Sequence, residues 1–248
     1  MYLSYLLINV GENPDRPRPG RLWLRNLHRV HQRLCMGFPS EERRSHDPQF
    51  LHPYKAGDFA PGHVHVRRSK DAGFLFRIDP QPGASPIIVV QSACRPDWDY
   101  AFQNARLLAA PPRVKPVEFR FQPGRRLRFR LRANPTRRAS QNSRRSDGRP
   151  IDPKWVGKRI PVPAHRLQDW LARRGQRGGF KIEVLNETIP GYVRFSKNGT
   201  SGRRHRLLSV LFEGVLNVTD TEAFAKTLRA GIGTAKAYGF GLLSIAPA

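Results

Sequence analysis

The sequence predicts an α+β protein made of two tandem ferredoxin-like domains, each with the βαββαβ order that RRM-like folds also have. Two observations support this class. The same order of strands and helices occurs twice along the chain, and 248 residues with 39% hydrophobic content can fill two small cores. We therefore expect domains at residues 1–120 and 121–248. This architecture alone does not decide a function.

The first half opens with an apolar segment, residues 1–9. It lacks a basic lead-in and is too short to span a bilayer, so it is expected to be a strand. In residues 22–37, Trp23, Leu27 and Val30 recur at helical spacing, which predicts a helix with one buried face. The remaining elements of this half are two strands, a helix and a strand, expected at 73–78, 87–93, 97–108 and 117–121.

The second half repeats this order. A capping-box pattern, Thr219 to Glu222, opens its second helix. The expected strands are 127–133, 180–185, 207–218 and 242–246, and the expected helices are 164–174 and 222–230. Two further segments, 39–72 and 137–149, lack a sustained apolar period and are expected to be loosely structured, the first as a mobile insertion.

The charge of the chain indicates a polyanionic partner. Lys and Arg number 44 against 19 Asp and Glu, which gives a formal net charge of +25. Most of the excess is arginine, whose planar guanidinium matches phosphates and guanine edges. Charge alone leaves DNA, RNA and an acidic protein open as partners. A membrane surface is disfavoured, because the sequence has no basic amphipathic helix with a broad apolar face.

The two cysteines, Cys35 and Cys94, have neither metal-binding nor redox spacing. They fit small buried hydrophobes in a reducing cytoplasm, so a cytoplasmic location is expected.

Residues 137–149 are dense in arginine and hydrogen-bonding side chains, with further cations before and after them. A solvated loop is one interpretation. We favour a cationic surface for a phosphate backbone. The side chains expected to bind it are Arg130, Arg132, Arg137, Arg138, Arg144, Arg145, Lys158 and Arg159.

A glycine-rich segment, residues 231–241, allows backbone to approach a phosphate closely and carries one lysine, Lys236. Dinucleotide fingerprints and P-loops follow a strand and precede a helix, whereas this segment follows a helix and precedes a strand. Contact with a polyanion is therefore a better functional prediction than a mononucleotide cofactor. The alternative is a helix C-cap at Gly231 followed by a tight turn.

His28 and His31 lie one helical turn apart on the strip beside the predicted buried face, at the border between core and solvent. An imidazole there can take a proton from a ribose 2′-hydroxyl or give one to a departing 5′-oxygen. Two half-buried histidines with a structural role remain an alternative. Zinc binding is disfavoured, because the pair lacks the glutamate of an HExxH pattern and no third ligand is positioned; only His63 and His65 could fold back to supply one.

Several strings together resemble the CasE family, the endoribonucleases that process CRISPR repeats in the type I-E Cascade complex. They are the N-terminal strand, the HxxHQxLxxxFP pattern from His28 to Pro39, the string FRLRANP at 129–135 and the ending LFEGVL…GIGxAKAxGxGLLSIAP. The resemblance covers both halves. It implies cleavage of precursor CRISPR RNA at the base of each repeat stem-loop, without a metal or other cofactor. It also implies continued binding to the 3′ handle of the product, beside other Cascade subunits.

The resemblance assigns the catalytic histidine to His31. His28 stands where the family commonly has a tyrosine, which leaves its role open. The family's glycine-rich loop corresponds to Gly231, Gly233, Lys236 and Gly239, with Lys236 as the phosphate contact, and its RNA-reading basic segment to the arginines between 137 and 159. Two alternatives remain: a non-catalytic subunit that binds RNA hairpins, and an arginine-rich protein of ribosomal type.

Overall fold

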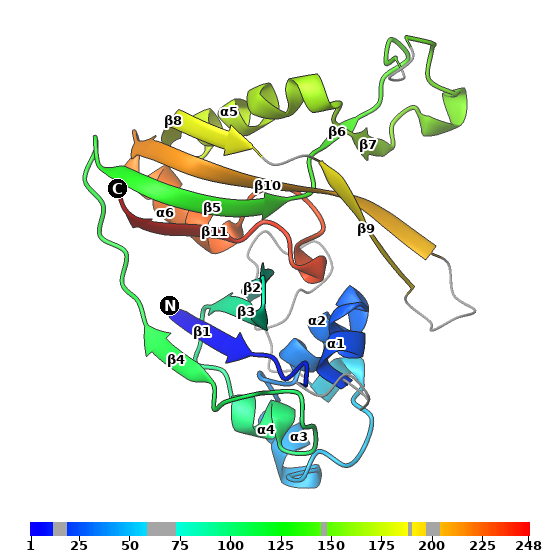
Figure 1. The fold of residues 1–248 in the computed structure, drawn as a ribbon, viewed down its shortest axis with the longest axis vertical. Helices are drawn as coiled ribbons and strands as arrows, with labels where there is room; N and C mark the ends of the chain where they lie inside the picture. The colour runs from blue at the N-terminus through cyan, green and yellow to red at the C-terminus, as the bar shows by residue number, and fades with distance from the viewer. Residues whose placement is uncertain (12–18, 59–72, 145–147, 188–189, 197–203) are drawn as a thin grey trace.

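The computed structural model describes residues 1–11, 19–58, 73–144, 148–187, 190–196 and 204–248. Its two larger antiparallel sheets stand one above the other in Figure 1. Within the described ranges, no helix is long and apolar enough to cross a membrane.

The first sheet has the strand order β2-β3-β1-β4, with every neighbouring pair antiparallel. Alternation places Leu6 of β1 and Ile8, one residue beyond its end, on the same face, where both are fully buried. They pack with the helices into a core that also holds Val30, Phe74 and Phe76. The elements of this domain are β1 (Tyr2–Leu7), α1 (Pro19–Leu24), α2 (Leu27–Cys35), α3 (Glu41–His46), η1 (Ala56–Asp58), β2 (Phe74–Gln81), β3 (Ala84–Ser92), α4 (Trp98–Phe102) and β4 (Arg113–Pro116).

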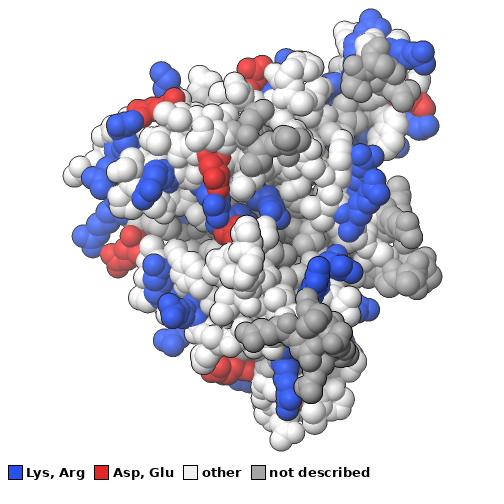
Figure 2. All heavy atoms as spheres, in the orientation of Figure 1, with Lys and Arg blue, Asp and Glu red and all other residues white. Residues whose placement is uncertain are grey.

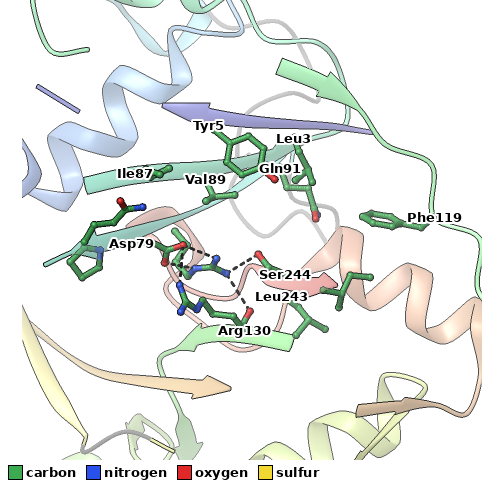
Figure 3. A pocket seen from close by; sticks show the side chains of 14 residues that line it. Leu3, Tyr5, Asp79, Ile87, Val89, Gln91, Phe119, Arg130, Leu243 and Ser244 are labelled. Atoms are coloured by element: carbon green, nitrogen blue, oxygen red, sulfur yellow. Dashed lines mark hydrogen bonds and ion pairs between the residues drawn. The ribbon is translucent and has the colours of Figure 1, made fainter. Parts of the chain in front are cut away.

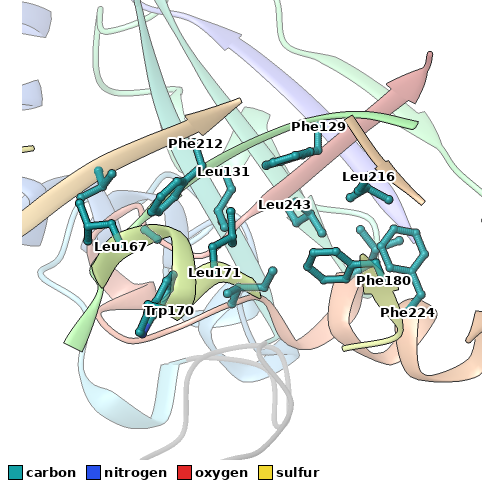
Figure 4. Packing of buried hydrophobic residues seen from close by; sticks show 14 of the residues in the cluster. Phe129, Leu131, Leu167, Trp170, Leu171, Phe180, Phe212, Leu216, Phe224 and Leu243 are labelled. Carbon is teal, nitrogen blue, oxygen red and sulfur yellow. The ribbon is translucent and has the colours of Figure 1, made fainter. Parts of the chain in front are cut away.

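The second sheet has the order β11-β5-β10-β8, again antiparallel throughout. Phe129 and Leu131 of β5 point into a core that Trp170 and Phe224 close from the helices (Figure 4). The elements are β5 (Arg126–Ala133), β6 (Thr136–Arg138), η2 (Pro153–Trp155), β7 (Arg159–Pro161), η3 (Ala164–Arg166), α5 (Leu167–Arg177), β8 (Phe180–Glu187), β9 (Gly191–Ser196), β10 (Arg204–Val218), α6 (Thr221–Ala230), η4 (Lys236–Tyr238) and β11 (Leu243–Pro247).

Both sheets place their strands in the spatial order fourth, first, third, second. This is the order of a split βαβ unit, so the predicted tandem ferredoxin-like fold is confirmed. The boundary between residues 120 and 121 stays a prediction. Residues 117–125 connect β4 to β5.

Several predicted boundaries were wrong. The helix expected at 22–37 is two helices, because the Asn26 side chain caps a new start. The helix expected at 97–108 ends at Phe102. The strand expected at 117–121 lies at Arg113–Pro116 instead, while Phe119 and Phe121 pack against the second core.

The prediction of a mobile insertion at 39–72 was wrong for its first part. Residues 40–58 are ordered around a buried ion-pair network. Arg43 donates to Asp47 at 2.6 Å, to Asp58 at 2.9 Å and to the Tyr100 hydroxyl at 3.0 Å. Residues 59–72 lie outside the described ranges.

The start of the basic segment is a strand where a loose loop was expected, and one further strand was missed. Arg137 and Arg138 lie in β6, which pairs with β7 to form the base of a hairpin that projects from the second domain (Figure 1). Strand β9 pairs with the first part of the long β10, beside this hairpin.

Candidate functional site

Helix α2 carries both candidate histidines, and its start is fixed locally. The Asn26 side chain accepts hydrogen bonds from the backbone N–H groups of His28 and Arg29, each at 3.2 Å. The Asn26 amide in turn donates to the backbone oxygen of Ser196 in β9, at 3.2 Å. The helix therefore begins at a point that the second domain holds.

His31 is half-buried against the first core. Its ring stacks on Phe74, with centroids 5.4 Å apart, and on Phe76, at 6.3 Å. Its Nε2 lies 3.6 Å from the Sγ atom of Cys35, one turn further along α2. Burial raises the pKa of the Cys35 thiol to about 12, so this neighbour carries no charge at neutral pH. His28 is also half-buried, as the helical spacing predicted.

The glycine-rich segment is a tight loop of the second domain that packs against the first domain. Gly231 caps α6 with φ 72°, and its N–H donates to the Thr227 oxygen at 2.8 Å, which confirms the C-cap alternative for this residue. A Cβ at Gly231 would lie 2.8 Å from Leu75 of β2, and one at Gly239 3.1 Å from Phe76. The glycines are therefore required by close packing on the first domain.

Lys236 lies inside this loop, at the start of η4. Its ammonium group donates to the backbone oxygen of Ala230, the last residue of α6. A cation at this end of a helix stabilises the unpaired carbonyl groups there.

The fold brings His31 and this loop together, although they lie near opposite ends of the sequence. Phe76 contacts both, since His31 stacks on it and Gly239 packs against it. Helix α2 also lies directly against η4. The His31 imidazole and the lysine-bearing loop thus share one border between the domains.

The predicted basic residues form two groups. Arg130 and Arg132 lie on the β5 face that looks toward the first domain, where Arg130 pairs with Glu213 and lies 3.8 Å from Asp79. Arg132 is half-buried, and burial lowers the pKa of its guanidinium. The second group is on the β6–β7 hairpin and comprises Arg137, Arg138, Arg144, Lys158 and Arg159; Arg145 lies outside the described residues.

The hairpin group is largely accessible. Arg138, Arg144, Lys158 and Arg159 are exposed, whereas Arg137 also donates to the Ser143 hydroxyl at 2.7 Å and so stiffens the hairpin. Figure 2 shows Lys and Arg atoms gathered on the projecting part at the upper right, where Figure 1 labels β6 and β7. Among the predicted basic residues, the accessible group therefore lies on the hairpin, whereas Arg130 lies at the domain interface.

Sequence reasoning missed Arg77, which joins the two sheets. Its side chain is 4% exposed and holds Asp79 with two hydrogen bonds, of 2.7 and 2.8 Å. It also donates to the Ser244 hydroxyl at 2.8 Å, across the pocket that lies between the sheets (Figure 3). The signal that could have indicated a buried ion pair was a single arginine among the apolar residues 73–78, two positions before Asp79.

No group of three or more His, Cys, Asp and Glu side chains is placed to hold a metal ion in the part of the chain that the structure describes. His63 and His65 fall outside that part.

Known proteins identify the family. A family model described as "CRISPR associated protein" matches residues 1–247, and the CRISPR system Cascade subunit CasE of Escherichia coli K12 is 30% identical over the whole of both chains. The chain belongs to the CasE family of CRISPR-associated proteins. This CasE family member is also 34% identical to the CRISPR-associated endoribonuclease Cse3 of Thermus thermophilus, over 73% of this chain and 85% of that one.

Solved structures agree with this assignment. CRISPR endoribonuclease Cse3 bound to 19 nt RNA superposes with a TM-score of 0.69 at 29% identity, with both chains fully covered. Cas6e of Escherichia coli K-12 gives 0.59 at 27% identity, again over both whole chains. The match extends through both ferredoxin-like domains and includes the glycine-rich ending.

Proposed function

We propose that this protein is an endoribonuclease that cleaves precursor CRISPR RNA at the base of the repeat stem-loop. It then stays on the 3′ handle of its product as a subunit of Cascade, in the cytoplasm. The observation that carries this proposal is the meeting of His31 and the glycine-rich loop across Phe76. The names of the relatives support it, since one is called an endoribonuclease and another a Cascade subunit.

The reaction is an in-line attack by a ribose 2′-oxygen on the adjacent 3′ phosphate. A bond forms between this oxygen and phosphorus, and the bond to the 5′-oxygen of the next nucleotide breaks. The products are a 2′,3′-cyclic phosphate and a 5′-hydroxyl. His31 takes the 2′ proton or gives a proton to the leaving 5′-oxygen, a role that suits an imidazole near neutral pH. The chemistry requires no metal ion.

Lys236 and the neighbouring loop amides would stabilise the extra negative charge of the phosphorane. Preorganised donors of this kind contribute roughly 3 kcal/mol each. The Lys236 ammonium is held at the end of α6 by the Ala230 oxygen, so it is already fixed beside the loop. Binding of a phosphate would add to or replace this hydrogen bond.

The β6–β7 hairpin supplies the surface for the RNA stem. The major groove of A-form RNA is too deep and narrow for ordinary side chains to read, so recognition rests on shape and phosphate contacts. Exposed arginines such as Arg138 and Arg159 provide these contacts and release counterions on binding.

A labelled repeat hairpin, incubated with the protein and excess chelator, tests the proposal. Where a CRISPR array lies near the gene, its repeat supplies the sequence of the hairpin. We expect a cut at the base of the stem that leaves a cyclic phosphate end. A hairpin with a 2′-deoxyribose in the nucleotide 5′ to the cut should still bind but should not be cleaved. Cleavage of the deoxy substrate would rule out the mechanism.

His28 supports one alternative, a subunit that binds the hairpin without cutting it. An imidazole is not equivalent to a phenol of much higher pKa, so a second catalytic group could be missing at this position. A stable, uncut complex in the same assay would establish this alternative.

A further inference from the structure

A groove of about 870 Å³ lies between the β6–β7 hairpin and the start of β9, apart from the border that holds His31. Two aromatic side chains line it and are unusually accessible. Trp155, at the end of η2, is 45% exposed, and Tyr192, in β9, is 49% exposed. Two exposed rings in one groove with a polar rim form the kind of patch that marks an interaction site.

Cations hold both rings in place. The guanidinium carbon of Arg206 lies 3.6 Å from the Tyr192 ring centroid, and the Lys158 ammonium lies 5.6 Å from the Trp155 centroid. The backbone beneath Trp155 is fixed as well, because the Asp152 carboxylate caps η2 by accepting from the Lys154 N–H at 3.0 Å. The rings are therefore ordered before any ligand arrives.

The groove has a strong charge bias. Its lining includes four cationic side chains and a single acidic one, Asp152, which already pairs with Lys154 at 2.6 Å. The cationic side chains are Arg137, Arg144, Lys154 and Arg159. Aromatic rings beside a row of guanidinium groups are the combination that binds single-stranded nucleic acid, because phosphates meet the cations and bases stack on the rings.

We propose that this groove binds an unpaired segment of the RNA next to the repeat stem, with bases stacked on Trp155 and Tyr192 and phosphates on the arginines. Unpaired RNA is the fitting occupant because the bases of a duplex already stack on each other and offer no free face. The inference rests on the proposed function, since it names a second contact with the same RNA. According to this proposal, the protein recognises the unpaired RNA beside the stem as well as the stem itself.

The test uses the full-length protein and hairpins with a 2′-deoxyribose at the cut site, so that none is cleaved. One hairpin carries single-stranded flanks, and a second has abasic flanks, which keep the phosphates but lack the bases. A third keeps only the one nucleotide on the 3′ side of the scissile phosphate. We expect the natural flanks to bind roughly 5- to 150-fold more tightly than the abasic ones, the range for stacking of one base.

Variants of the two aromatic residues then show whether these rings cause the preference for natural flanks. Trp155→Ala and Tyr192→Ala should each lose much of the preference for natural over abasic flanks, whereas Trp155→Phe and Tyr192→Phe should keep it. Leu22→Ala, which removes another exposed apolar side chain (62%) in the first domain, is the control and should change nothing.

Equal affinity for natural and abasic flanks would overturn the inference, as would alanine variants that retain the preference. If the alanine variants retain the preference, the groove binds something other than the RNA flank, such as a protein. Failure of the proposed function is separate, because it shows as no cleavage of the all-ribose form of the hairpin that keeps only one nucleotide beyond the scissile phosphate. Cleavage of that hairpin should be unchanged in the alanine variants.

Discussion

The His31 imidazole lies on the ring of Phe74, with the two centroids 5.4 Å apart and the ring planes at 26°. Phe74 is fully buried, so the position of the candidate catalytic ring is set by the core of the first domain. A change at His31 should therefore affect proton transfer without altering the cationic hairpin.

His31→Ala should lower the single-turnover cleavage rate by about 10²- to 10⁴-fold, the usual contribution of a general acid or base, with little change in affinity for the hairpin. Gel shifts and product formation on one repeat RNA measure the two quantities. His46→Ala, at an exposed site on α3, is the control. Undiminished cleavage would remove His31 from the mechanism.

Lys236→Met should reduce the cleavage rate by roughly 10²-fold, because it removes one donor to the developing charge. The same change removes a cation from the end of α6, so thermal unfolding is followed in parallel. Lys226→Met, at an exposed position on that helix, should leave the rate unaltered. A loss of stability without a loss of rate would restrict Lys236 to a structural role.

Arg138→Ala combined with Arg159→Ala should weaken hairpin binding and flatten its dependence on salt. Each lost phosphate contact reduces the slope of log affinity against log salt by about 0.7 to 0.9. Arg113→Ala in β4, at the opposite end of the molecule in Figure 1, removes an exposed cation without touching the hairpin. An unchanged salt slope in the double variant would contradict the assignment of the RNA stem to this surface.

Stability should fall as the pH rises from about 9 to 12, in part through Cys35. Burial raises the pKa of its thiol from 9.0 to about 12 in the folded protein. In that window the unfolded chain loses a proton that the folded chain keeps, so unfolding becomes more favourable. Urea titrations across this range should show a smaller decline for Cys35→Ala than for the wild type. Parallel declines would contradict the assignment.

Arg77→Ala should destabilise the protein by about 3 to 5 kcal/mol, because it leaves Asp79 without its bidentate partner and removes a contact with Ser244. Arg128→Ala provides the comparison, since this exposed arginine donates only to the Pro247 oxygen in the described structure. A surface contact of this kind contributes about 0 to 1 kcal/mol. Similar melting temperatures for the two variants would exclude a structural role for Arg77 between the sheets.

The strand and helix order was predictable from sequence because apolar periodicity marks most of the two cores. The failures have particular causes. Phe119 and Phe121 alternate like a strand, yet they lie outside the assigned strands and pack their partly buried rings against the second core. The capping side chain of Asn26 interrupts a pattern that otherwise reads as one helix.

The β6–β7 hairpin shows a different limit. Its register pairs Arg137 with Ile160 and Arg138 with Arg159, across the long connection from 139 to 158, so no local pattern identifies it. For the site, motif resemblance indicated His31 and the glycine-rich loop, but not that both contact Phe76. Trp155 and Tyr192 are far apart in sequence, and only the folded chain shows that they line one groove.

The hydrogen bond from the Asn26 amide to the Ser196 oxygen connects the helix of His31 to a strand of the other domain. The two halves are therefore not interchangeable parts. A chimera that joins residues 1–120 of one family member to residues 121–248 of another would keep this anchor only where the second half holds the end of β9 at the same place beside α2. Because the acceptor is a backbone oxygen, the chimera would lose the anchor through a displaced β9 and not through the identity of residue 196.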